Sequence, residues 1–222
     1  GTNKKNIHPT PVIGGVGLIK KLSNITNHKF KKNIYPTPVI GGVGLIKKLS
    51  KPLNHIFKKD KSVLILIGKT FGHLEQSCFL KENYSIKEGM PPEINLLNEK
   101  NNGECLLKLI NKNLILSSHD ISSGGLIVTL SEMALKSDYG AKIHKPKKLT
   151  NLLKYFFGED QARYVIEVDA TNYPSVEKIL KEDNIFFENI GFTQKEYLEI
   201  EGELKISNKD LFKINNEWYN NY

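Results

Sequence analysis

The chain has 222 residues, of which 39% are hydrophobic and 9% aromatic, proportions that exclude an intrinsically disordered protein. Its formal net charge is +8, but Arg163 is the single arginine among 32 basic residues. Surfaces that bind nucleic acid use the planar guanidinium group of arginine to contact phosphates. A positive charge built from dispersed lysines therefore does not favour nucleic acid as a partner.

The first fifty residues contain a repeat. Asn6–Ser23 and Asn33–Ser50 are 27 residues apart and differ only where His8 is replaced by Tyr35. A repeat architecture needs at least three copies to share a continuous core, so two nearly identical copies indicate a recent in-frame duplication or a sequence-assembly artefact. The second copy leads directly into the rest of the chain, and we take it as the structural one. The expected division is a spare copy over 1–32, a strand segment over 33–50 and a main α/β domain over 51–222.

The first half of the main domain alternates strand and helix signals. The expected elements are a buried strand over Val63–Ile67, a short helix over His73–Asn83, a helix over 94–111 that Pro91 and Pro92 precede, and a strand over Leu114–Ser117. A helix follows, in which Leu126, Leu130, Met133 and Ala134 recur at helical spacing. We expect Tyr139-Gly140 to end that helix.

The second half continues the alternation. We expect a short helix near 149–157, a strand over Tyr164–Val168, a helix over Tyr173–Glu182, strands near Phe186–Phe192 and Tyr197–Ile200, and a closing helix over Asp210–Tyr222. The pattern predicts an α/β fold, with a mixed sheet and helices packed on it.

The cysteines and the lengths of the apolar runs indicate the subcellular location of the protein. Cys78 and Cys105 have no partner at metal-ligand spacing, which indicates reduced, partly buried thiols. The longest strand-like apolar run, Val63–Ile67, is too short to cross a bilayer, and Pro9 and Pro11 interrupt any signal peptide. We expect a cytoplasmic protein without a membrane partner.

The segment from His119 to Gly125 carries the most information about chemistry. It joins a strand to a helix, and Asp120, Ser122 or Ser123 is placed to cap that helix. Its two glycines let backbone amides approach an anion such as a nucleotide phosphate, although an ordinary capped helix with a tight turn fits the same residues. Adjacent residues on an extended backbone point in opposite directions, so we expect that His119 and Asp120 do not form a His–Asp relay with each other.

Three further motifs give less information about a functional site. Gly68-Lys69-Thr70 resembles the end of a phosphate-binding loop, but Val63 stands where that motif requires glycine. Gly41-Gly42-Val43-Gly44 lacks the dinucleotide-binding spacing and predicts a close approach of two backbones. The segment from Phe157 to Tyr164 places two carboxylates and an arginine before a strand, as either the edge of a site or a salt-bridged turn.

Five segments occur in an order that resembles one family. They are PTPVIGGVGLI, LIGKTFGHLEQS, PPEINLLNEKNNGECLLKLI, HDISSGGLIVTLSEMAL and FGEDQARYVIEV. Together they are similar to the C-terminal part of phosphoribosylformylglycinamidine synthase large subunits, within the aminoimidazole ribonucleotide synthetase superfamily. The resemblance runs from Asn33 to Tyr222. It implies that 33–50 is the last strand of a preceding domain and that 51–222 is the synthetase-like C-terminal domain.

The resemblance implies an ATP-dependent carbon–nitrogen ligase. Such a synthase uses ATP and magnesium to phosphorylate the amide oxygen of formylglycinamide ribonucleotide, and ammonia released from glutamine then attacks. The implied partners are the remaining domains of the synthase, a glutaminase subunit and a small accessory subunit. Catalytic residues and metal ligands are expected in those other domains, so we expect neither a catalytic residue nor a metal ligand here, and an inactive isolated chain.

The residues implied to line the nucleotide or substrate cleft are His119, Asp120, Ser122, Ser123, Gly124 and Gly125, with Gly41, Gly42 and Gly44 as weaker candidates. One departure matters, because the family usually has aspartate at the position of Ser123, and serine brings no charge. Two alternatives remain open from the residues: a non-catalytic interaction module that keeps the fold, or another ATP-using member of the superfamily.

Overall fold

The computed structural model describes residues 53–146 and 151–220. The repeat, the strand segment 33–50 and the three glycines Gly41, Gly42 and Gly44 lie outside the described residues.

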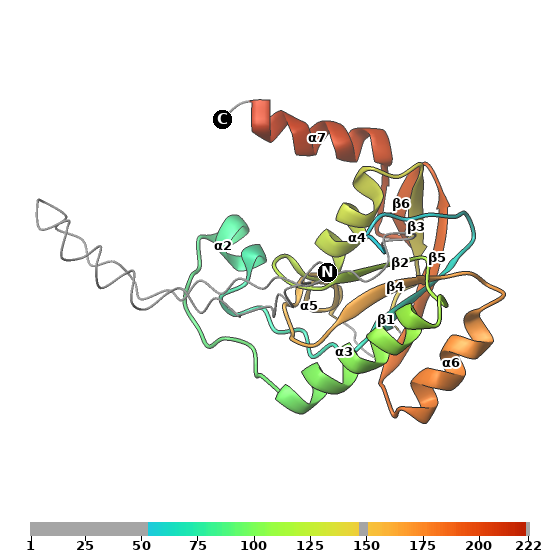
Figure 1. Ribbon diagram of the computed structural model, residues 1–222. Helices are drawn as coiled ribbons and strands as arrows, with labels where there is room; N and C mark the ends of the chain where they lie inside the picture. Colours follow the sequence, from blue (N-terminus) through green and yellow to red (C-terminus); the bar gives the residue numbers. More distant parts are fainter. Residues whose placement is uncertain (1–52, 147–150, 221–222) are drawn as a thin grey trace, which may run out of the picture. The chain divides into compact units, whose positions relative to one another are not determined.

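A seven-stranded mixed sheet forms the centre of the domain (Figure 1). Its strands are β1 (Val63–Ile67), β2 (Ser117–Asp120), β3 (Tyr139–Ile143), β4 (Tyr164–Val168), β5 (Phe187–Lys195), β6 (Tyr197–Ile200) and β7 (Leu204–Ser207). They lie in the order β2-β4-β1-β5-β3-β6-β7, and only the β3–β6 pair is parallel. This confirms the predicted α/β fold with a mixed sheet.

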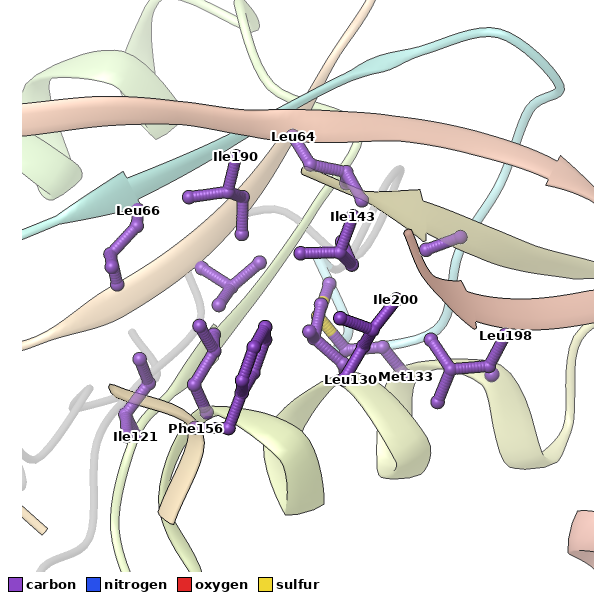
Figure 2. Close-up of a cluster of buried hydrophobic side chains, with 14 of the residues drawn as sticks. Leu64, Leu66, Ile121, Leu130, Met133, Ile143, Phe156, Ile190, Leu198 and Ile200 are labelled. Atoms are coloured by element: carbon purple, nitrogen blue, oxygen red, sulfur yellow. The ribbon is translucent and has the colours of Figure 1, made fainter. Parts of the chain in front are cut away.

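Helices cover both faces of the sheet, as the burial of four consecutive residues of β1 requires. Leu64 and Leu66 point into one apolar cluster and Ile65 and Ile67 into the other, so β1 is buried on both sides. Figure 2 shows the first cluster between the sheet and α4 (Gly125–Leu135). Burial of apolar side chains on two faces, at about 25 cal/mol per Å² removed from water, is the main force that holds these layers together.

The remaining helices are α2 (Cys78–Tyr84), α3 (Leu96–Asn111), α5 (Leu152–Phe157), α6 (Tyr173–Glu182) and α7 (Asn208–Asn220). Side chains of α3 and α6 belong to the second cluster, and those of α4 and α5 belong to the first. In the part of the chain that the structure describes, no helix is both long enough and apolar enough to cross a membrane.

Two predicted elements are shifted along the chain. The strand expected over Leu114–Ser117 begins only at Ser117, because the preceding apolar residues pack into the second cluster directly after α3 ends. His119 and Asp120 are therefore the last residues of a strand. The helix expected from His73 begins at Cys78, because the backbone amide of His73 binds the Asp160 carboxylate.

Two strands were not predicted. Tyr139-Gly140 was expected to end a helix, but that helix ends at Leu135 and Tyr139 begins β3. Gly140 is needed for strand packing, since a Cβ atom there would lie 2.0 Å from the Tyr197 carbonyl oxygen. The second strand, β7, is four residues long and exposed at its start, and the alternation of Leu204 and Ile206 with Lys205 and Ser207 was not recognised as a strand signal.

Candidate functional site

The candidate site lies where the edge strand β2 leads into α4. Asp120, Ser122 and Ser123 are exposed there, whereas Gly124 and Gly125 are buried. The two serines and the carboxylate are therefore available to a ligand, and the two glycines are part of the packed interior.

His119 is held between two carboxylates. Its Nδ1 lies 3.2 Å from Asp120 Oδ1, its Nε2 lies 3.0 Å from Glu132 Oε2 on α4, and its ring is 5.1 Å from that of His55. The expectation that the side chains of His119 and Asp120 point in opposite directions is wrong. Asp120 is the last residue of β2, and its exposed side chain reaches back to the imidazole of His119. The arrangement fixes the imidazole and links β2 to α4.

The helix start differs from the prediction that Asp120, Ser122 or Ser123 caps it. Gly124 is the N-cap residue of α4, with φ +84° and no side-chain capping hydrogen bond. Gly125 also has a positive φ, and a Cβ atom there would lie 2.7 Å from the Phe156 and Gly158 carbonyl oxygens. The glycines therefore allow α4 to begin in close contact with the end of α5, a role of packing and backbone conformation.

The anion position at this helix start is taken by a carboxylate of the chain itself. Glu159 Oε1 accepts hydrogen bonds from the Gly124 amide and from the Cys78 amide, each at 2.7 Å. One carboxylate therefore joins the starts of α2 and α4, where negative charge is favourable. The sequence indicated that the Gly124 amide could bind a phosphate, but in the structure this amide donates its hydrogen bond to Glu159.

The neighbouring residues Asp160 and Arg163 are buried and almost fully paired. The Asp160 carboxylate accepts hydrogen bonds from the amides of Phe71, Gly72 and His73 at 2.9–3.2 Å. The Arg163 guanidinium donates to the Thr70 hydroxyl at 3.1 Å and to the Gly158 carbonyl. Burial lowers the pKa of Arg163, and the charge of Asp160 opposes that shift. Of the two readings of this segment, the structure supports the structural turn.

A groove of about 710 Å³ lies beside this turn. Its polar lining includes His73, Glu75, Glu93, Lys154 and Asp160. None of the predicted site residues lines it. Its lining comes from segments far apart in the chain, and Asp160 belongs to the segment Phe157–Tyr164 that the sequence indicated as either the edge of a site or a turn.

Metal binding and thiol chemistry find little support in the described segments. Residues 53–146 and 151–220 contain no group of three or more His, Cys, Asp or Glu side chains arranged to hold a metal ion. Both cysteines are free, and Cys78 is exposed, which corrects the expectation of partial burial for that thiol. Cys105 is buried, and burial, with help from Asp183, raises its pKa to about 12. A thiol with that pKa is unreactive at neutral pH.

Comparison with known proteins identifies the fold. Residues 60–201 match the family described as "AIR synthase related protein, C-terminal domain". Over 221 residues the chain is 47% identical to the phosphoribosylformylglycinamidine synthase subunit PurL of Pelagibacter ubique and 36% identical to that of Rhodopseudomonas palustris (strain TIE-1). These matches cover 100% of this chain but only 27% and 26% of the relatives, so the chain spans about a quarter of their length.

Solved structures agree with the fold. A structure titled "T. maritima PurL complexed with FGAR" superposes with a TM-score of 0.59 at 16% identity, over 72% of this chain and 29% of that one. "T. maritima PurL complexed with ATP" gives 0.54 at 15% identity and "Structure of PurLQS from Thermotoga maritima" gives 0.53 at 16%, each over 72% of this chain and 27% of the other.

Proposed function

Given that the chain belongs to the family of the AIR synthase related C-terminal domain, we propose that it works as one part of a PurL-type phosphoribosylformylglycinamidine synthase. The observation that carries this proposal is the 47% identity that extends over 221 residues of this chain while covering 27% of the relative. Identity over the whole chain supports a shared role, and the low coverage means that other segments must supply the rest of the enzyme.

The reaction of the whole enzyme is the ATP-dependent conversion of an amide to an amidine. ATP supplies a phosphoryl group that turns the amide oxygen of formylglycinamide ribonucleotide into a leaving group, and ammonia replaces it. Magnesium would be bound by other segments, since the described residues contain no suitable ligand cluster. We therefore assign no proton-transfer or metal-binding step to residues 53–146 and 151–220.

The contribution proposed for this chain is a wall of the nucleotide or substrate cleft. The exposed Asp120, Ser122 and Ser123 would contact the ligand, and the contact between His119 and Glu132 would hold β2 against α4 behind them. Because Glu159 occupies the Gly124 amide, side chains rather than that amide would meet a phosphate. Gly41, Gly42 and Gly44 remain weaker candidates for the same cleft.

The proposed partners are the remaining domains of the synthase, together with a glutaminase subunit and a small accessory subunit. The solved PurLQS structure, which shares this fold, is consistent with an assembly of that kind.

Enzyme assays of the isolated chain and of a chimera test this proposal. We expect the purified 222-residue chain to form no amidine product from formylglycinamide ribonucleotide, ATP and ammonia. A chimera in which this chain replaces the matching segment of the Pelagibacter ubique relative should form product. A non-catalytic interaction module would leave the folded chimera inactive, and turnover by the isolated chain comparable to that of the intact relative would also contradict the proposal.

A further inference from the structure

The most exposed apolar side chains of the described residues gather in one segment. Six large apolar residues between 71 and 97 are each at least 60% exposed, and elsewhere in the described ranges such side chains reach only 58%. We call these six the apolar rim: Phe71, Tyr84, Met90, Ile94, Leu96 and Leu97. Figure 1 shows that α2, the start of α3 and the connection between them lie on one side of the domain. Such a concentration marks an interaction surface.

The backbone that carries the rim is held in place. The Met90 amide donates to Glu75 Oε2 at 2.6 Å, and the Met90 carbonyl oxygen lies 2.9 Å from His73 Nε2. Asn95 caps α3 by accepting a hydrogen bond from the Asn98 amide at 2.9 Å. These contacts fix the backbone at Met90 and at the start of α3, which carries Leu96 and Leu97. A surface built in this way loses little conformational entropy when it binds.

The chemistry of the rim defines a complementary partner. Residues 71–97 contain two lysines and four glutamates in a chain whose net charge is +8, so the most apolar surface is also locally acidic. The groove of about 710 Å³ is lined by one rim residue, Phe71, and by Glu75 and Glu93 from the same segment. An apolar surface that also presents lysine or arginine side chains would fit it.

The rim is continuous with the candidate site. Glu159 binds the amide of Cys78, at the start of α2, and the amide of Gly124, in the candidate site. Asp160 holds the backbone of Phe71, a rim residue that also lines the groove. A polypeptide that covers the exposed Ser122 and Ser123 would therefore lie next to the start of α2 and to Phe71 of the rim.

We propose that the apolar rim is the surface on which the remaining polypeptide of the synthase packs, through an apolar segment that carries positive charge. This inference rests on the proposed function, because the relatives contain about three quarters of a chain that this one does not match. A second copy of this chain and a separate glutaminase subunit are the competing occupants.

Hydrogen exchange measured on the isolated chain and on the Pelagibacter ubique chimera tests the rim directly. We expect amides of 84–97 to exchange at least about tenfold more slowly in the chimera, because the covering polypeptide suppresses local opening. The slowing should be lost when Met90→Lys and Leu97→Lys are introduced together. Leu107→Lys is the matched control: it lies on the same helix as Leu97, is 58% exposed, and should retain the slowing.

The outcomes separate this inference from the proposed function. Suppose the chimera is active but the amides of 84–97 exchange no more slowly, or still exchange more slowly after the double substitution. This result would contradict the rim as the packing surface without contradicting the proposed function. An inactive chimera with slowing would contradict the function while supporting the rim as the packing surface. Slowing that appears only after the glutaminase subunit is added, or in the isolated chain at a doubled mass, would assign the rim to those occupants and overturn the inference.

Discussion

The turn Gly158–Arg163 and the loop His119–Gly125 lie side by side, and both carry charged or polar residues that a sequence could present as a site. Ile121 donates its amide to the Arg163 carbonyl at 2.9 Å, and the Gly124 amide binds Glu159. The difference lies in burial. Arg163 and Asp160 are 1% and 5% exposed and paired within the chain, whereas Asp120, Ser122 and Ser123 are exposed.

The difference shows how a structural polar segment can be distinguished from a candidate ligand-binding one. In the turn, each charge meets donors or acceptors at a distance fixed by folding, so little hydrogen-bonding capacity is left for a ligand. In the loop, the serine hydroxyls and the Asp120 carboxylate face solvent. Substitutions in the turn should therefore lower stability, and substitutions in the exposed part of the loop should not.

The largest effect is expected from Asp160→Ala. The change leaves three amides of residues 71–73 without their acceptor and removes the charge nearest the buried Arg163 guanidinium, 3.9 Å away. We expect a loss of about 3–5 kcal/mol in the free energy of unfolding, measured by urea denaturation of the 222-residue chain. Asp160→Asn keeps one acceptor oxygen and should cost clearly less. Equal losses from both variants would show that charge, rather than hydrogen bonding, stabilises the turn.

A smaller loss is expected from Gly125→Ala, a residue of the loop that is buried. Its positive φ of +72° and the carbonyl oxygens at 2.7 Å leave no room for a methyl group. We expect about 2 kcal/mol of destabilisation in the same denaturation assay. Gly103→Ala on α3 is the control, because the new Cβ atom would meet only the Tyr164 hydroxyl at 3.9 Å. It should raise stability by about 0.5–1 kcal/mol, and a comparable loss there would contradict the packing role assigned to Gly125.

The smallest effect is expected from Ser123→Asp, which introduces the residue that the synthase family usually has. Ser123 is exposed and makes no capping hydrogen bond to α4, so the free energy of unfolding should change by no more than about 0.5 kcal/mol. Thermal unfolding followed by circular dichroism would measure the change. A loss above about 1 kcal/mol would mean that the exposed loop is as structural as the turn, and the contrast between the two segments would disappear.

Local patterns in the sequence were enough for much of the fold. The apolar run Val63–Ile67 predicted β1, and the helix expected over Tyr173–Glu182 has the bounds that the structure gives for α6. They were enough because β1 is a continuous apolar run buried on both faces, and α6 buries Val176 and Leu180 one helical turn apart. β3 and the true start of β2 were not predicted, since those strands depend on partners far along the chain, such as Tyr197 for Gly140 and Glu167 for Ser117.

The sequence by itself determined the fold class, the order of most elements and the family that the motifs resemble. Only the tertiary structure decided that Glu159 fills the helix start at Gly124, that His119 contacts Glu132, and that the groove forms beside Asp160. The physical reason is distance along the chain. Asp160 binds amides 87 to 89 residues away, and no local spacing of residue types records which distant donor a buried carboxylate will meet.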